Sequence, residues 1–121
     1  DEEGNKNNHA TVLGNTMKRI KNLAVEENIP IMVLSQLNRE IEKRTDDSKP
    51  KLTDLRDSGV LEQAADIVIF INRPEQQGKT KDVNGESLAG IGFLKVAKNR
   101  NGSTGITRFR YNENVTRLSD Y

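Results

Sequence analysis

Two cations in the C-terminal third of the sequence have a spacing that suits phosphate chemistry. Lys98 and Arg100 alternate with Asn99 on a predicted strand, so both side chains project from the same face. The pair leads into Asn101-Gly102, a dipeptide typical of tight hairpin turns. Two such cations can act as a finger that stabilises transition-state charge on the nucleotide of a neighbouring subunit. The alternative is an exposed basic hairpin whose charges only prevent aggregation.

A side-chain amide provides a second candidate. Gln36 follows the apolar run 29–34, which predicts a strand buried on both faces, and so stands at the carboxyl end of that strand. An amide both donates and accepts hydrogen bonds, so it can contact a phosphate oxygen or an attacking water. The alternative is the ordinary polarity of a strand-to-loop junction.

A third candidate is the turn that contains Arg56, Asp57 and Gly59, directly before a predicted helix. A cation, backbone amides and a glycine that permits close approach can grip a nucleic-acid phosphate at such a place. The alternative is a helix N-terminal cap beside a solvent-exposed arginine. Taken alone, this turn favours the second interpretation.

The other motifs in the sequence do not predict a phosphate-binding loop, a metal site or a catalytic dyad. Gly78-Lys79-Thr80 resembles the end of a phosphate-binding loop, but Arg73 occupies the position of the required first glycine and no helix is predicted to follow. We expect a surface loop there. His9 is the only histidine and the chain has no cysteine, so neither a metal site nor a histidine-based dyad is predicted.

The elements that position the candidates follow from hydrophobic periodicity. Apolar residues at helical spacing predict a helix that begins near Thr11 and ends at Asn28 and Pro30. Helix, buried strand, helix and strand in this order, followed by a hairpin, indicate an α/β sheet with an antiparallel edge. The remaining predictions are an exposed loop at 38–51, a helix at 59–65, a strand at 66–71, a flexible loop insertion at 74–87, and strands at 91–97, 106–111 and 115–118.

Composition limits the class of protein. The chain has 121 residues, enough for one domain or part of one, with 33% hydrophobic and 31% charged residues. No signal peptide and no apolar run of about 18 residues is present, so a cytoplasmic location without membrane contact is expected. The net charge is only +1, but residues 95–110 contain five basic residues and no acidic one. The missing Met start suggests an excised piece of a longer protein.

Three stretches together resemble one family. Leu34-Ser35-Gln36-Leu37-Asn38-Arg39, Asp54-Leu55-Arg56-Asp57-Ser58-Gly59 and Lys98-Asn99-Arg100-Asn101-Gly102 occur in the order found in DnaB-type replicative DNA helicases. The similarity extends from about Thr11 to Tyr121 and covers the C-terminal part of the RecA-like ATPase domain. It implies that residues 1–121 form a partial RecA-like (P-loop NTPase) three-layer α/β fold, with parallel strands and an antiparallel C-terminal hairpin edge.

The resemblance also implies a function. The family forms homohexameric rings that hydrolyse ATP with Mg²⁺ and move 5′ to 3′ on single-stranded DNA. By resemblance, Gln36 senses the terminal phosphate, while Lys98 and Arg100 reach the nucleotide of the neighbouring subunit. Arg56, Asp57 and Gly59 match the DNA-binding loop, although Glu is commoner than Asp at position 57.

Several expectations concern the whole protein. Helicase loader and primase are possible partners through the full-length chain. The phosphate-binding loop, its catalytic Glu and the magnesium-coordinating Asp do not occur in these residues, so the piece alone is expected to be inactive. Two alternatives stay open: a RecA-like ATPase of signalling or recombination type, and a non-enzymatic nucleic-acid binding module.

Overall fold

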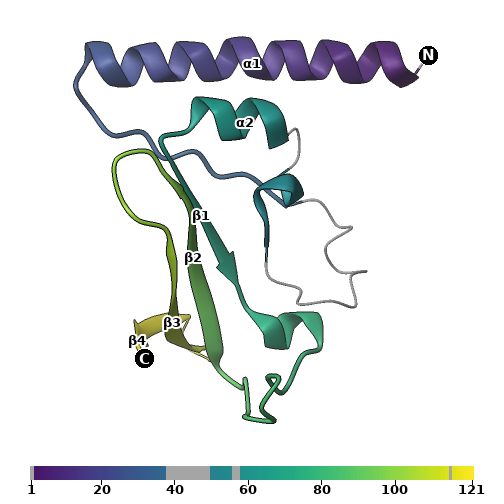
Figure 1. Ribbon diagram of the computed structural model, residues 1–121, viewed down its shortest axis with the longest axis vertical. Helices are drawn as coiled ribbons and strands as arrows, with labels where there is room; N and C mark the ends of the chain where they lie inside the picture. Colours follow the sequence, from purple (N-terminus) through teal and green to yellow (C-terminus); the bar gives the residue numbers. More distant parts are fainter. Residues whose placement is uncertain (1, 38–49, 56–57, 115) are drawn as a thin grey trace. The chain divides into compact units, whose positions relative to one another are not determined.

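The computed structural model describes residues 2–37, 50–55, 58–114 and 116–121 (Figure 1). These residues belong to two compact units. The first unit contains the described residues up to 37 together with 51–55 and 58–65, and the second contains Pro50 and the described residues from 66 onwards. The predicted loop at 38–51 lies mostly outside the described residues, as do Arg56 and Asp57.

The first unit begins with one long helix, α1 (Glu2–Glu26). The helix starts well before the predicted position, so the expectation of a cap at Thr11 was wrong. No proline interrupts residues 2–10, and helical hydrogen bonds can therefore propagate towards the N-terminus. Within the described part of the chain, no helix has both the length and the apolar character needed to cross a membrane.

The end of α1 is where the sequence predicts it. Asn28 adopts a left-handed conformation with φ of 51°. The Ile29 amide donates to the Ala24 carbonyl at 3.0 Å, and the Asn28 amide donates to the Val25 carbonyl at 3.3 Å. These two bonds form a Schellman motif, which satisfies carbonyls that would otherwise lack a partner at the helix end.

A short helix, α2 (Ser58–Ala64), packs against α1 and confirms the helix predicted at 59–65. Met17 is buried, and a Cβ added at Gly14 would lie 3.7 Å from Cγ1 of Val60. Before α2, the 3₁₀ turn η2 (Leu52–Asp54) is closed by the buried Asp54 carboxylate, which accepts a hydrogen bond from the Lys51 amide at 2.7 Å.

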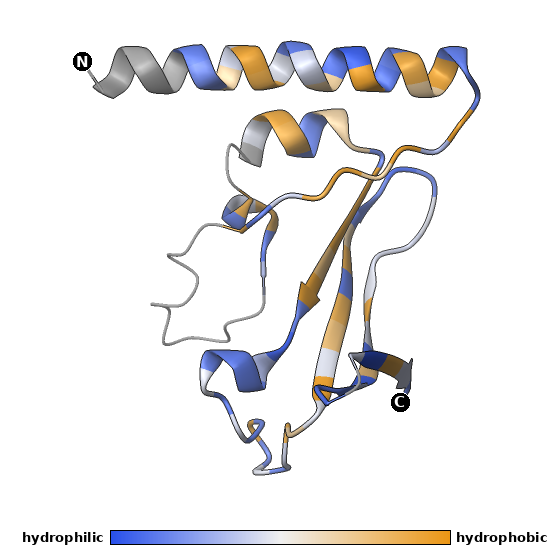
Figure 2. Ribbon diagram, turned by 180° about the vertical axis from the view of Figure 1, so that it is seen from behind, coloured by the Kyte–Doolittle hydropathy of each residue, from blue (hydrophilic) through white to orange (hydrophobic). Residues whose placement is uncertain are grey.

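The apolar segment 29–34 is not a strand, so the expectation of a strand buried on both faces was wrong for this chain. The segment runs as an extended coil (Figure 2), and its hydrophobic side chains are exposed, to 85% for Met32 and 90% for Leu34. A strand exists only where a second strand satisfies its backbone hydrogen bonds. Near this segment, the described residues give a single bridge, between Leu37 and Leu55.

The second unit is built on a four-stranded antiparallel sheet in the order β1-β2-β3-β4. The predicted strands are confirmed with shifted ends. Their bounds are β1 (Ile67–Asn72), β2 (Ile91–Asn99), β3 (Gly105–Asn112) and β4 (Arg117–Asp120). All pairings between these named strands are antiparallel, so the parallel strands expected of the fold do not occur among them.

The burial of β1 alternates along the strand. Val68, Phe70 and Asn72 are buried, whereas Ile67 and the other isoleucines on the opposite face are about half exposed or more. Alternation of this kind is typical of a sheet that has one covered face. Figure 2 shows that hydrophobic residues run along most of β1.

The connection from β1 to β2 is a series of hydrogen-bonded turns. It begins with the 3₁₀ helix η3 (Pro74–Gln77), which ends at Gly78 with φ of 77°. The Asp82 carboxylate then accepts hydrogen bonds from two backbone amides, and Leu88 is buried. No helix follows Gly78-Lys79-Thr80, which agrees with a surface loop and not with a phosphate-binding loop.

The hairpin between β2 and β3 confirms the one predicted around Asn101-Gly102, but its turn is not the tight type that this dipeptide usually forms. The last pair of the two strands is Val96 and Gly105, so the connection is longer than a two-residue turn. Neither Asn101 nor Gly102 has the positive φ that the predicted turn type requires. Instead, Nδ2 of Asn99 donates to the Ser103 carbonyl at 3.3 Å and closes the connection.

Candidate functional site

The basic pair lies at the end of β2, where a β-bulge decides its direction. Val68 pairs with Lys98, but Ile69 pairs with Val96, so Ala97 is an extra residue in β2. Opposed residues of an antiparallel pair share a face of the sheet. Without the bulge, Lys98 would oppose Ile67 on the other face. The bulge therefore turns Lys98 and Arg100 to the face that carries Val68, and bulges commonly re-aim side chains in this way.

Arg100 contacts the chain through Asp66, a residue to which the sequence analysis assigned no role. The Arg100 amide donates to the Asp66 carbonyl at 2.9 Å, and Nη1 of Arg100 lies 2.8 Å from Oδ1 of Asp66. Both side chains are about half exposed, at 51% and 46%. The guanidinium is therefore both anchored and reachable from solvent.

Two other predicted residues, Gln36 and Gly59, belong to the first unit, while Arg56 and Asp57 lie outside the described residues. Gln36 is exposed at the end of the extended segment, one residue before the bridge between Leu37 and Leu55. Gly59 is exposed in the first turn of α2, and a Cβ built on it would meet no atom within 4 Å. Nothing in the described chain therefore requires a glycine at position 59.

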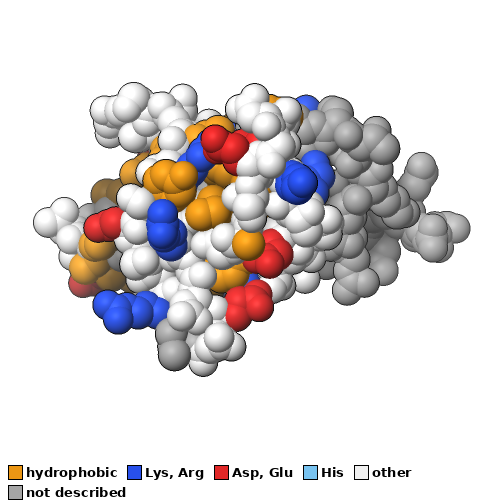
Figure 3. Space-filling model, turned by 90° about the horizontal axis from the view of Figure 1, so that it is seen from below, with side chains coloured by type: hydrophobic (Ala, Val, Ile, Leu, Met, Phe, Trp, Pro, Cys, Tyr) orange, Lys and Arg blue, Asp and Glu red, His pale blue; other side chains and the backbone are white. Residues whose placement is uncertain are grey.

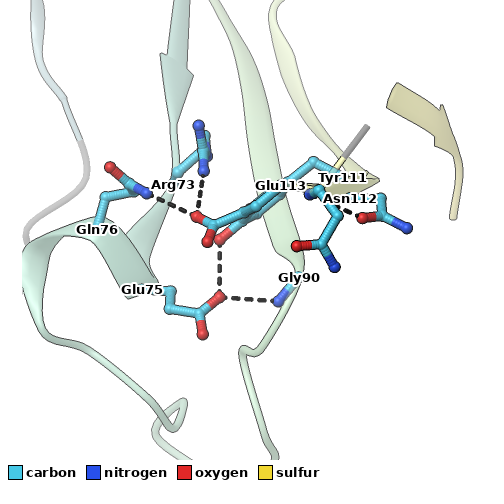
Figure 4. A network of polar contacts seen from close by, with 8 residues as sticks. Arg73, Glu75, Gln76, Gly90, Tyr111, Asn112 and Glu113 are labelled. Carbon is cyan, nitrogen blue, oxygen red and sulfur yellow. Dashed lines mark hydrogen bonds and ion pairs between the residues drawn. The ribbon is translucent and has the colours of Figure 1, made fainter. Parts of the chain in front are cut away.

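A polar network that the sequence analysis missed joins the start of the β1–β2 connection to the end of β3 (Figure 4). Arg73 stacks on the Tyr111 ring at 3.9 Å and bonds Glu113 at 2.7 Å. Gln76 also donates to Glu113 at 2.7 Å, and the Tyr111 hydroxyl donates to Glu75 at 2.8 Å. These side chains come from distant parts of the sequence, so only the folded sheet brings them together. We interpret the network as a structural clamp on this connection.

The network shifts two pKa values. The Gly90 amide and the Tyr111 hydroxyl both donate to Glu75, and with the nearby charge of Arg73 they hold the pKa of that carboxyl below its ordinary value of 4.5. Burial, followed by the hydrogen bond to Glu75, raises the pKa of Tyr111. A carboxyl whose pKa is lower in the folded state stabilises the fold above its unfolded-state pKa. That contribution to the free energy of unfolding is lost as the pH falls through the lowered pKa of Glu75.

We therefore expect Glu75→Gln to make the full-length protein less sensitive to acid. Between about pH 7 and about pH 3, the thermal midpoint of the wild type should fall further than that of Glu75→Gln, because only the wild type has this carboxylate to protonate. Thermal unfolding at the two pH values measures the difference. Glu86→Gln, an exposed change in the same connection, is the matched control and should behave as the wild type. Equal falls in all three proteins would contradict the assignment.

The face shown in Figure 3 has no simple electrostatic signature. On the face shown in Figure 3, Lys, Arg, Asp and Glu side chains are interspersed with exposed hydrophobic ones. Among the residues that the structure describes, no three His, Cys, Asp or Glu side chains come together in a way that could hold a metal ion.

Comparison with protein families gives one match along nearly the whole chain. The family model described as the DnaB-like helicase C terminal domain matches residues 1–120. Replicative DNA helicase DnaB of Buchnera aphidicola subsp. Acyrthosiphon pisum is 38% identical over 114 residues, which cover 94% of this chain and 24% of that protein. Replicative DNA helicase DnaB of Mycoplasma pneumoniae is 41% identical over 113 residues, covering 86% of this chain and 22% of that protein. The chain thus spans about a quarter of the length of such relatives.

Solved structures give a similar result. One structure, described as an ATPase domain, has a TM-score of 0.77 and 29% identity, covering 90% of this chain and 36% of that one. A structure of a DnaB-like replicative helicase and its interactions with primase has a TM-score of 0.73 and 30% identity, covering 87% of this chain and 24% of that one. These likenesses confirm the expected RecA-like α/β fold class for the chain.

Proposed function

This chain belongs to the DnaB-like helicase C-terminal domain family, and we propose that it is the C-terminal part of the ATPase domain of an ATP-dependent replicative DNA helicase. The family match confirms the resemblance inferred from the three motifs. The observation that best supports a role in catalysis is the bulge at Ala97, because it turns Lys98 and Arg100 together to the face of the sheet that carries Val68. Arg100 there is 51% exposed and able to meet an anion.

Each candidate residue has a proposed role. Gln36 senses the terminal phosphate of ATP through its amide. Lys98 and Arg100 extend to the nucleotide of the neighbouring subunit and stabilise the negative charge of the transition state. Arg56, Asp57 and Gly59 hold the backbone of single-stranded DNA. The described residues do not form a magnesium site, so the metal that accompanies ATP is not assigned to them.

The proposal for the whole protein is a homohexameric ring that unwinds duplex DNA by moving 5′ to 3′ on single-stranded DNA, with a cytoplasmic location. Interaction with primase is supported by the similar DnaB-like helicase, whose solved structure was described together with its interactions with primase. Interaction with a helicase loader is proposed from the family resemblance alone. Relatives named as replicative helicases support this proposal over the alternative of a signalling or recombination ATPase.

The DNA contact is tested by Arg56→Ala in the full-length protein. Hydrogen bonds to charged groups contribute about 1.5 to 3 kcal/mol, so we expect single-stranded DNA affinity to fall by about 10-fold to 100-fold. Nucleotide affinity should stay the same, because the proposed nucleotide contacts lie elsewhere in the chain. Fluorescence anisotropy with labelled oligonucleotide and labelled nucleotide measures both. Lys18→Ala, which removes an exposed cation from α1, is the control and should bind DNA as the wild type does.

Gly59→Ala tests the same turn without removing a charge. The added Cβ meets nothing within the chain, and alanine favours a helix more than glycine does, so the fold should be as stable or more stable. If the DNA backbone approaches Gly59 closely, the methyl group should nevertheless weaken DNA binding. Unchanged DNA affinity in both Arg56→Ala and Gly59→Ala would count against the proposed DNA loop.

A further inference from the structure

Asp66 directly precedes β1. Ile67 and Asn99 are the last pair of the ladder between β1 and β2, so Asp66 and Arg100 stand opposite each other just beyond it. The backbone bond at 2.9 Å and the ion pair at 2.8 Å join the same two residues. Asp66 therefore fixes both the backbone and the side chain of Arg100.

Among the residues that the structure describes, those on the opposite side of β2 give Arg100 no equivalent support. Pairing between β2 and β3 ends at Val96 and Gly105, four residues before Arg100 along β2. The connection beyond it is closed by the bond from Asn99 to Ser103, which does not include Arg100. The strand β1, through Asp66, is thus the neighbouring strand that anchors Arg100.

The chemistry of the pair leaves Arg100 able to bind an anion. The ion pair uses Nη1, and a guanidinium has five N–H donors in a fixed plane. A carboxylate that holds one edge of the guanidinium limits its rotation while the other donors can still contact phosphate oxygens. A half-exposed ion pair of this kind adds little to stability, so its main effect is on orientation.

We infer that Asp66 is a positioning residue for Arg100, which it orients for the nucleotide of the neighbouring subunit. This inference rests on the proposed role of Arg100 in that contact. Asp66 itself touches neither nucleotide nor DNA in this scheme. Loss of orientation lowers the rate of the chemical step, because misplacing a catalytic group by about 1 Å can reduce turnover about 100-fold.

Mixed rings of full-length subunits test the inference. One subunit type, the donor, has a disabled phosphate-binding loop and an intact Arg100. The other type, the acceptor, has an intact loop and carries Arg100→Ala. Each type alone should be inactive, and ATPase activity in the mixture comes from interfaces where a donor supplies Arg100 to an acceptor. Asp66→Ala is then introduced either into the donor or into the acceptor, so the effect of the same substitution is compared between the two subunit types.

We expect Asp66→Ala on the donor to lower the recovered kcat by about 10-fold to 100-fold, with little change in the KM for ATP. On the acceptor it should have no effect, because that subunit has no Arg100 to orient. Asp66→Glu on the donor should retain part of the activity, and Asp120→Ala, which removes an exposed carboxylate from β4, should retain all of it.

The outcomes distinguish a failure of the positioning role of Asp66 from a failure of the proposed role of Arg100. A loss of activity with Asp66→Ala on both types, as misfolding would give, or on neither type overturns the positioning role of Asp66. If the starting mixture recovers no activity at all, the role of Arg100 at a neighbouring subunit is wrong, and the inference about Asp66 is overturned with it.

Discussion

Replacing Arg100 with alanine in the full-length protein is expected to lower kcat for ATP hydrolysis by about 10³-fold or more, the range typical of an arginine finger. The KM for ATP should change far less, because the side chain acts on charge that develops in the transition state. Steady-state ATPase assays with and without single-stranded DNA measure both constants. Arg110→Ala is the matched control, since Arg110 is an exposed arginine that stacks on Tyr121 in the same sheet. It should stay within about twofold of the wild type, as surface substitutions usually do.

The donor and acceptor mixture shows whether Arg100 acts across a subunit interface. In a random ring with equal amounts of both types, about a quarter of interfaces pair an intact phosphate-binding loop with a neighbour's intact Arg100. Activity should therefore reappear when two inactive proteins are mixed. If kcat of Arg100→Ala alone stays near that of the wild type, the finger assignment is wrong. If Arg100→Ala is inactive but mixing restores nothing, Arg100 acts within its own subunit.

The sequence predicted most elements because their signals are local. The end of α1 at Asn28, the helix α2 and the four strands follow from helix-stop residues and periodicity, and each is present. The expected cap at Thr11 was wrong, since a helix start depends on whether preceding residues continue the hydrogen bonds. The hairpin predicted around Asn101-Gly102 is present, but its connection is longer than the two-residue turn typical of that dipeptide, and the side chain of Asn99 closes it.

The spacing of residues in the sequence could not predict two properties of the candidate site: the face of the sheet on which the basic pair lies, and the contact with Asp66. Alternation predicted that Lys98 and Arg100 share a face, but which face depends on the bulge at Ala97. A bulge is visible only in the register of two paired strands, and nothing in residues 95–100 marks it. The contact between Asp66 and Arg100 likewise depends on residues 34 positions apart that the ladder brings together. Pairing over such distances has no local signal in a single sequence.

We expect the second large effect, on stability, from a substitution in the exposed segment 29–34. In this chain Leu34 is 90% exposed and Val83, in the β1–β2 connection, is 98% exposed, so both side chains contact mainly water. A similar ATPase domain is longer, since this chain covers 36% of it. We expect the remainder of the ATPase domain to cover the apolar side chains of 29–34 in the full-length protein. No such cover is expected for Val83, which lies among hydrogen-bonded turns of a polar connection.

Leu34→Asp should therefore destabilise the full-length ATPase domain by about 2 kcal/mol or more, while Val83→Asp should have almost no effect. Burying a leucine side chain contributes about 1.5 to 3 kcal/mol, and a buried unpaired carboxylate is unfavourable in addition. Thermal unfolding should show a midpoint about 5 °C lower for Leu34→Asp. Hydrogen exchange should show protected amides at 31–34 in the wild type. If the two substitutions have the same small effect, segment 29–34 stays exposed in the whole protein, and Gln36 is then not held at a buried nucleotide site.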